Sequence, residues 1–374
     1  MNTPQLREAC ASKLDAAAAR VGSLRAFVGL DGFVDEIIHV VDKRSDAETF
    51  QRVPTIAKLA ERIGAAAGRS TNVELVTKLI KLGGNGPIMA NALASLGLKV
   101  TYLGTLGYPD LHPVFKKFAQ TAEVHSVAEA AHTDALEFED GKLLFGKMVP
   151  LNDMTWKNIQ DRFGRDRFAG HFAQSELVAF VNWTMIPYMS HIWESLLSEL
   201  CPSLNGPRRK IFFDLADPEK RPAEDIRHAL QLIGKFQAHF DAILGVNEKE
   251  AYEIANALGI AARPHTPEGL SEMSLEIAQK LQIDTLVVHP VAYALAVSGG
   301  QVAVVEGPFI EKPLITTGAG DHFNSGFCTG KLLGLSLAEC VLCGVSTSGY
   351  YVRTAQSPSV TQLAGLMRQW PSAS

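Results

Sequence analysis

The sequence predicts an α/β protein: a doubly wound, mostly parallel β-sheet flanked by helices, with a smaller β-sheet beside it. Three observations lead to this fold class. Apolar runs alternate with helical patterns from about Arg25 to the end of the 374-residue chain. These runs are continuous, as expected for strands buried on both faces of a sheet. Two further stretches alternate only in part and do not fit that sheet. Because there is no repeat, low-complexity tract or linker, we expect one domain over residues 1–374.

The predicted strands of the main sheet are short apolar runs separated by helical segments. The N-terminal stretch Met1–Ala19 is polar and alanine-rich, and we expect a surface helix there. A second helix with small residues on one face is expected over Asn85–Leu96. The predicted strands are Arg25–Leu30, Lys99–Gly104, Leu177–Asn182, Lys210–Leu215, Ala242–Val246 and Thr285–His289.

The two stretches that do not fit the main sheet are Asp35–Asp42 and Ala135–Lys147. The first follows the first predicted strand directly, and the second is centred on an Asp-Gly turn, which is a good hairpin signal. Together they could form a small β-sheet, from residues 35–44 and 133–148, that projects from the main body. The alternative is two edge strands of the main sheet.

Composition describes an ordinary soluble globular protein, with 47% hydrophobic and 20% charged residues. The net charge of −5 gives no electrostatic basis for binding nucleic acid or an anionic membrane. No apolar run is long enough to cross a bilayer, and the N-terminus does not look like a secretory signal. Five scattered cysteines indicate a reducing, cytoplasmic location. Cys340 and Cys343 have no second pair at zinc spacing, so we expect core thiols.

The clearest chemical signal is the Gly-Ala-Gly-Asp sequence at residues 318–321. Thr316 and Thr317 precede it, and a helical pattern follows it. Glycines let the backbone approach an anion, and the unpaired N–H groups and positive dipole end of a helix favour a phosphate. Asp321 suits a general base that takes a proton from a hydroxyl attacking phosphorus. The alternative is an ordinary capping aspartate in the first helical turn.

Three other segments carry polar groups near predicted strand ends. Gly29–Asp35 leaves the first strand at its carboxyl end, where open α/β sheets bind ligands, and its two carboxylates could accept hydrogen bonds from hydroxyl groups. The turn at residues 83–85 offers backbone N–H groups to a polar ligand. Asn247 and Glu250 open a helix and could organise Mg²⁺. The alternative interpretations are a solvated turn for Gly29–Asp35, a plain helix start for residues 83–85 and a capping box for Asn247 and Glu250.

These motifs, in this order, resemble the ribokinase (PfkB) family of sugar kinases. The resemblance extends from Gly29 to about Ser359. The C-terminal signature of the family is matched by Thr316, Gly318, Ala319, Gly320, Asp321, Phe323, Gly326 and Phe327. Its first signature is matched by Gly83, Gly84, Ala90, Leu93, Ala94, Leu96 and Gly97.

The resemblance implies transfer of the γ-phosphoryl group of ATP to a hydroxyl of a sugar or sugar-like acceptor. Asp321 would be the general base, and the amides of Gly318, Ala319 and Gly320 would form the anion hole. Mg²⁺ would be organised by Asn247 and Glu250, through water, beside a nucleotide that Thr316 and Thr317 also border. The acceptor would be held by Asp31, Asp35, Gly83, Gly84 and Asn85. The small sheet would act as a lid that excludes water, and through it two copies of the chain could form a homodimer.

The chain departs from the family pattern at several positions. Ile315 replaces an aspartate that in many members helps to hold a monovalent cation, which argues against potassium activation. Ile88 replaces the usual asparagine, and Asn85 is the candidate substitute for its amide. Two family glycines are absent, at Val291 and Ala294, so we expect a reshaped nucleotide pocket. His289 in the same loop is interpreted as a core or turn histidine.

Two other functions fit parts of the sequence. The spacing within Gly29–Asp35 and the run from Gly83 to Asn91 are similar to ADP-dependent sugar kinases of the same superfamily. Alternatively, the altered positions would suit a non-catalytic ligand-sensing or scaffold protein on the kinase fold. The intact Gly-Ala-Gly-Asp sequence favours an enzyme, because a scaffold has little need for a carboxylate in an anion-binding turn.

Overall fold

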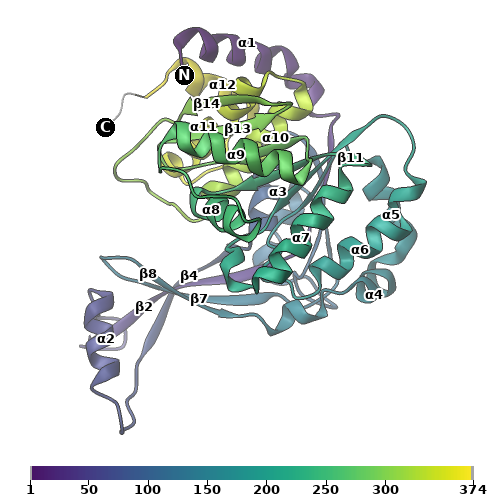
Figure 1. Cartoon of the computed structure of the whole chain (residues 1–374). Helices are drawn as coiled ribbons and strands as arrows, with labels where there is room; N and C mark the ends of the chain where they lie inside the picture. The colour runs from purple at the N-terminus through teal and green to yellow at the C-terminus, as the bar shows by residue number, and fades with distance from the viewer. Residues whose placement is uncertain (1, 372–374) are drawn as a thin grey trace.

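The computed structural model describes residues 2–371, and its body is a nine-stranded sheet with helices on both faces (Figure 1). The strand order is β14-β13-β12-β11-β10-β9-β1-β5-β6. Strands from β6 across to β12 run parallel, and β13 and β14 add an antiparallel edge. The strands are β1 (Arg25–Gly29), β5 (Lys99–Gly104), β6 (Glu123–Ser126), β9 (Leu177–Phe180), β10 (Arg209–Asp214), β11 (Phe240–Val246), β12 (Thr285–Val288), β13 (Tyr293–Ser298) and β14 (Gln301–Glu306).

Each face of this sheet carries its own hydrophobic core, because successive side chains of a strand point to opposite faces. Phe212 and Phe213 of β10 show this directly, since each belongs to a different core. One face is covered by α1 (Pro4–Val21), α3 (Asn85–Ser95), α10 (Ala319–Leu333), α11 (Leu337–Thr354) and α12 (Val360–Arg368). The other is covered by α4 (Trp156–Ile159), α5 (Arg165–Gln174), α6 (Met189–Glu199), α7 (Ala223–Phe236), α8 (Glu248–Ala257) and α9 (Pro267–Leu281).

A second, five-stranded sheet extends away from the body (Figure 1). Its order is β3-β2-β7-β8, with β4 also paired to β2, and α2 (Ile56–Gly64) packs at its far end through Leu59. Short helical turns connect the elements of both sheets, at Pro113–Phe115, Phe118–Gln120, Val149–Asp153, Gln160–Gly164, Cys201–Ser203 and Pro218–Lys220. The strands of this sheet are β2 (Phe33–Arg44), β3 (Phe50–Arg52), β4 (Leu75–Gly83), β7 (Ala131–Glu137) and β8 (Lys142–Lys147).

The predicted α/β fold class and the small separate sheet are confirmed. Each predicted strand of the main sheet lies within two residues of its observed ends, and the Asp140-Gly141 turn joins β7 to β8. The sequence analysis did not predict β3, β6 and β13, and it also missed β4, whose apolar residues recur at helical as well as strand spacing. This strand matters because it leads directly into the turn before α3. The extent of the single domain stays a prediction, and its residues 1 and 372–374 lie outside the described part of the chain.

The remaining expectations about the chain ends and cysteines can also be compared with the structure. The predicted N-terminal helix is α1, whose Cys10 and Leu14 are buried, while Met1 lies outside the described residues. All five cysteines are buried free thiols, so the expectation of core thiols at Cys340 and Cys343 is confirmed. Within residues 2–371, no helix has the length and hydropathy needed to cross a membrane.

Candidate active site

A cavity of about 410 Å³, here called the cleft, lies at the carboxyl ends of the parallel strands, next to the small sheet. Most of the predicted site residues line it: Asp35, Gly84, Asn85, Asn247, Glu250, Thr317, Gly318, Gly320 and Asp321. Four others do not, namely Asp31, Gly83, Thr316 and Ala319. The rest of the lining is Phe33, Thr133, Leu144, Gly146, Met148, Asn182, Met185, Asp214, Ala216, Asp217, Lys220 and His289.

The turn before α10 leaves two backbone amide groups without a hydrogen bond at the N-terminal end of that helix, within residues 2–371. Gly318 caps the helix with a φ of 90°, a conformation that favours glycine, and a Cβ there would lie 3.1 Å from Cγ2 of Ile88. The Ala319 amide donates to the Thr316 carbonyl at 3.1 Å. The amides of Gly318 and Gly320 have no hydrogen-bond partner within the described part of the chain. They point out of the positive end of a 15-residue helix, which suits a phosphate.

Two aromatic side chains that the sequence analysis did not single out hold this turn. The Tyr351 hydroxyl donates to the Thr317 carbonyl at 3.0 Å, and His322 Nδ1 bonds the Gly318 carbonyl at 2.7 Å. Their rings stack with centroids 3.6 Å apart. Burial lowers the pKa of His322 to about 4, so the ring is neutral and Nδ1 carries the proton that it donates. The carbonyl side of the turn is therefore held by α10 and α11 while its amides stay free.

Asp321 lies in the first turn of α10 and is 5% exposed. Burial raises the pKa of its carboxyl group to about 8, and the charges of Asp31 and Glu250 act in the same direction. A hydrogen bond from Asn85 Nδ2 to Asp321 Oδ1, at 3.1 Å, opposes this shift. A carboxylate whose pKa lies near neutral pH is well placed for general-base catalysis.

Asp31 lies behind the cleft and is fully buried. Its carboxylate accepts four hydrogen bonds: from the amides of Asn85 (3.0 Å) and Gly86 (2.9 Å), from Asn182 Nδ2 (2.7 Å) and from the Tyr102 hydroxyl (3.3 Å). Burial raises its pKa to about 6, and these donors oppose the shift. Asp31 therefore joins the ends of β1, β5 and β9 to the start of α3.

Asp35, by contrast, faces the cleft from β2. It pairs in register with Lys81 of β4 and Thr133 of β7. A Cβ on Gly83 would lie only 2.3 Å from the Asp35 carboxylate, so the glycine leaves room for this side chain. Burial raises the pKa of Asp35, while the charge of Lys81 and a hydrogen bond from Thr133 lower it. Of the two carboxylates in the Gly29–Asp35 segment, only Asp35 lines the cleft.

On the far side of the cleft, Asp214, Asp217 and Glu250 come together. Asn247 and Glu250 form a capping box at the start of α8, and the two Glu250 oxygens accept the amides of Asp217 and Asn247, each at 2.9 Å. Burial raises the pKa of Glu250, and it raises that of Asp214 well above its usual range, with Glu250 and Asp321 adding to the effect on Asp214. No group of three or more ligand side chains in residues 2–371 is arranged to hold a metal directly.

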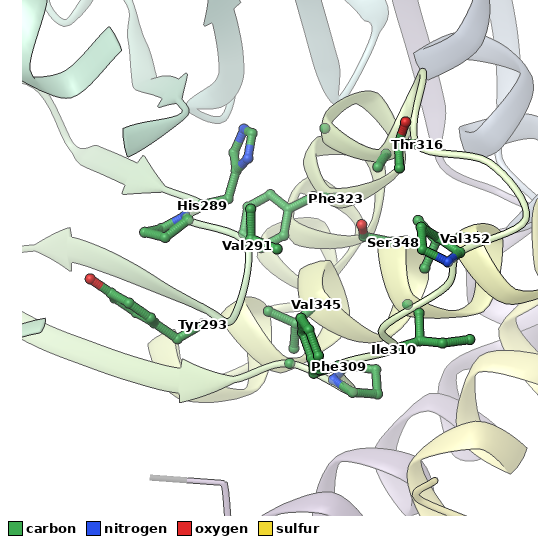
Figure 2. Close-up of a pocket in the computed structure, with 17 residues that line it drawn as sticks. His289, Val291, Tyr293, Phe309, Ile310, Thr316, Phe323, Val345, Ser348 and Val352 are labelled. Carbon is green, nitrogen blue, oxygen red and sulfur yellow. The ribbon is translucent and has the colours of Figure 1, made fainter. Parts of the chain in front are cut away.

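A second cavity, of about 290 Å³ and mostly apolar, opens on the other side of the same turn (Figure 2). His289 lines both cavities, packs at a tilt against Phe323 with ring centroids 4.9 Å apart, and would lie 3.2 Å from a Cβ on Gly320. Its ring is partly buried in the loop after β12, which is compatible with the interpretation as a core or turn histidine, and it also forms part of the wall between the two cavities. The other lining residues are Pro290, Val291, Tyr293, Gly307, Pro308, Phe309, Ile310, Pro313, Thr316, Ala319, Gly320, Val345, Ser348, Gly349 and Val352.

Comparison with known proteins places this fold and site in a class. A variant of Escherichia coli phosphofructokinase-2 superposes with a TM-score of 0.64 at 15% identity, covering 93% of this chain and 98% of that one. Arabidopsis thaliana ribokinase, solved with ribose and ATP, gives a TM-score of 0.62 at 16% identity, covering 92% and 98%. At these identities the similarity shows the ribokinase fold.

The fold and the cleft define an ATP-dependent carbohydrate kinase of the ribokinase (PfkB) class. Sequence comparison is more specific. The model of the family described as prokaryotic ketohexokinase matches residues 2–370, and the chain belongs to that family. A ketohexokinase from Haloferax volcanii is 28% identical over 346 residues, which cover 92% of this chain and 91% of that protein. Both the suspected family and the enzyme class are thereby confirmed.

We expect the Asp321→Asn protein to be more stable than the wild type near pH 8, and the difference to disappear near pH 4. The pKa of Asp321 is higher in the folded protein than in the unfolded chain. At a pH between these two pKa values the folded protein keeps a proton that the unfolded chain has released. The stability of the wild type therefore falls as the pH rises through this range. An amide removes this loss, which for a pKa raised from 3.8 to about 8 is on the order of 5 kcal/mol at pH 8. Urea titrations across this pH range measure the difference. Asp166→Asn, at a fully exposed side chain, is the control, and identical pH dependences for the wild type and Asp321→Asn would contradict the assignment.

Proposed function

We propose that the chain transfers the γ-phosphoryl group of ATP to a hydroxyl group of a ketohexose. The acceptor is inferred from the family and from the Haloferax volcanii ketohexokinase. The observation that carries the mechanism is the position of Asp321, a buried carboxylate with a raised pKa, directly beside the free amides of Gly318 and Gly320. A base and an anion site in one helical turn are what phosphoryl transfer to a hydroxyl requires.

In this proposal the nucleotide lies across the turn before α10. The adenosine part occupies the apolar cavity, whose walls include Phe309, Ile310 and Val352 (Figure 2). The phosphate chain then passes Thr316 and Thr317 towards the amides of Gly318 and Gly320. The Ala319 amide is already bonded to Thr316, and it joins the anion hole only by sharing that hydrogen bond. Each such donor contributes about 10²–10³-fold to the rate in comparable sites.

The sugar occupies the cleft between the small sheet and Asp321. Asp35 accepts hydrogen bonds from its hydroxyl groups, and the turn of Gly83, Gly84 and Asn85 borders it. In this proposal Asp31 does not contact the sugar and instead supports this turn from behind. Asp321 takes the proton from the attacking hydroxyl. The small sheet acts as a lid, with Leu144 and Met148 covering the sugar and keeping out water that would compete as acceptor.

The carboxylates of the cleft fit Mg²⁺ that is bound through water. Mg²⁺ prefers oxygen ligands and keeps several of its waters, and the raised pKa values of Asp214 and Glu250 show how strongly this region favours added positive charge. Both Glu250 oxygens and Asn247 Oδ1 accept backbone amides, so Asn247 and Glu250 would hold water molecules of the ion. When bound, Mg²⁺ would neutralise charge on the ATP phosphates.

The proposal also includes the oligomeric state of the protein and its location in the cell. The lid strands β4 and β8 expose Leu79, Ile80, Leu144 and Phe145, each more than half accessible. We propose that two chains pair through these strands into a homodimer and that the enzyme works in the reducing cytoplasm, where five free thiols persist.

The Asp321→Asn protein should lose acceptor-dependent turnover by about 10²–10⁴-fold while it keeps nucleotide binding, because only the base is removed. The measurement is nucleotide consumption with a panel of ketohexoses, aldohexoses, pentoses and nucleosides, run separately with ATP and ADP. Turnover with ATP and a ketohexose, lost in the variant, would support the proposal. A variant with a near-wild-type rate would exclude Asp321 as the base, and absence of turnover with every ketohexose would refute the proposed acceptor.

The Glu250→Gln protein should need more Mg²⁺ for half-maximal rate, because the amide is neutral and cannot accept hydrogen bonds through its NH₂ group. The measurement is a magnesium titration of the rate at saturating ATP. Glu248→Gln is a matched control, since Glu248 lies in the same helical turn but pairs with His265 outside the cleft. An unchanged titration in Glu250→Gln would count against its assigned role.

For the homodimer, Phe145→Glu combined with Ile80→Glu should convert the protein to a monomer in light scattering, because both exposed side chains lie on the same face of the lid sheet. Ile63→Glu is the control, since Ile63 is equally exposed but lies on α2. A wild-type protein that is monomeric at micromolar concentration would remove the assembly from the proposal.

A further inference from the structure

The contact between Asn85 and Asp321 suggests a function for Asn85 beyond bordering the sugar. Asn85 is the first residue of α3, and Asp321 lies in the first turn of α10. Asn85 Nδ2 donates to Asp321 Oδ1 at 3.1 Å. In residues 2–371, no other side chain donates a hydrogen bond to the Asp321 carboxylate. The orientation of the carboxylate therefore depends on one amide from another helix.

The Asn85 side chain is itself held in place from behind. Its backbone amide donates to Asp31 Oδ2, and the next amide along, of Gly86, donates to Asp31 Oδ1. Gly86 has to lack a side chain here, because a Cβ would lie 2.5 Å from that oxygen. Asp31 in turn is fixed by Asn182 and Tyr102. The start of α3 thus has little freedom to move relative to the main sheet.

The two helices are also fixed relative to each other on both sides of this contact. Towards the N-terminal side, Gly318 approaches Ile88, where an added Cβ would lie 3.1 Å from the Ile88 side chain. One turn further along α10, the Ser325 hydroxyl donates to the Met89 carbonyl at 3.1 Å. Asp321 lies between these two contacts along α10, and Asn85 lies one helical turn before Ile88 on α3, so the distance between them is set by helix packing.

We propose that Asn85 is a positioning residue for the general base: its amide orients the Asp321 carboxylate towards the acceptor hydroxyl and favours the charged form that can take the proton. This inference rests on the proposed role of Asp321 as base. It differs from the prediction that Asn85 binds the sugar, because the interaction is made with the enzyme's own carboxylate in the unliganded protein.

The surroundings of Asp321 make such a donor necessary. The titratable groups nearest to it are acidic or neutral: Asp31 at the end of β1, Tyr102 on β5, Asp214 at the end of β10, Glu250 on α8, Tyr351 on α11 and His289 after β12. Lys220 also lines the cleft, but its ammonium group pairs with Asp217. Burial and the charges of Asp31 and Glu250 favour the protonated acid, which is inactive as a base. Asn85 supplies the opposing interaction.

The test is the pH dependence of kcat/KM for the intact enzyme carrying Asn85→Ala or Asn85→Asp. The hydrogen bond lowers the pKa of Asp321, so its loss raises that pKa, and the acid limb of the profile should move to higher pH. The expected shift is about one pH unit, a tenfold loss of rate on that limb, for Asn85→Ala. It should be larger for Asn85→Asp, which places a second carboxylate against the base. Asn91→Ala, on the same helix and remote from the cleft, should keep the wild-type midpoint.

A second readout does not depend on turnover. The carboxyl carbon of Asp321, assigned in ¹³C NMR spectra by its absence in Asp321→Asn, should titrate at higher pH in Asn85→Ala than in the wild type. Unchanged midpoints in both the NMR titration and the rate profile, with only the KM for sugar increased, would show that Asn85 is a sugar ligand and overturn the inference. A shifted NMR midpoint in a protein that phosphorylates no sugar would support the Asn85 contact and refute the proposed function instead.

Discussion

The close approach of α3 and α10 at their N-terminal ends is the constraint on which the rest of the cleft depends. Glycine at residue 318 lets the turn before α10 pass the Ile88 side chain, and Ser325 bonds the Met89 carbonyl across the same interface. Both helices begin at the carboxyl ends of parallel strands, so their free amides and first-turn side chains meet at one point. The meeting of the free amides of Gly318 and Gly320 with the buried Asp321 carboxylate is a consequence of this packing.

A concentration of buried carboxyl groups is the second physical feature of the site. Asp31, Asp214, Glu250 and Asp321 are all nearly inaccessible, and burial raises the pKa of each. In each case a hydrogen-bond donor from the protein opposes the shift. These donors are backbone amides, asparagine side chains and the Tyr102 hydroxyl, rather than lysine or arginine.

Asp31 and Asp35 show how far sequence reasoning reached within the site. Both lie in the Gly29–Asp35 segment, and the sequence analysis expected both carboxylates to hold the acceptor. In the structure the chain continues into β2, which turns Asp35 towards the cleft, while Asp31 is enclosed by donors from β5, β9 and α3. The stacked pair of His322 and Tyr351, which holds the turn before α10, was also missed. Its two residues come from different helices, and neither belongs to a local sequence motif.

The sequence by itself determined what depends on neighbours along the chain. Continuous apolar runs predicted the strands, and the Gly-Ala-Gly-Asp turn predicted an anion site with a carboxylate, because backbone conformation and helix ends are local properties. Only the tertiary structure decided which groups meet across long separations. The Asn85 amide reaches Asp321 across 236 positions of the chain, and β4 became a strand because it pairs with β2. Such contacts arise from packing and burial, which no local pattern records.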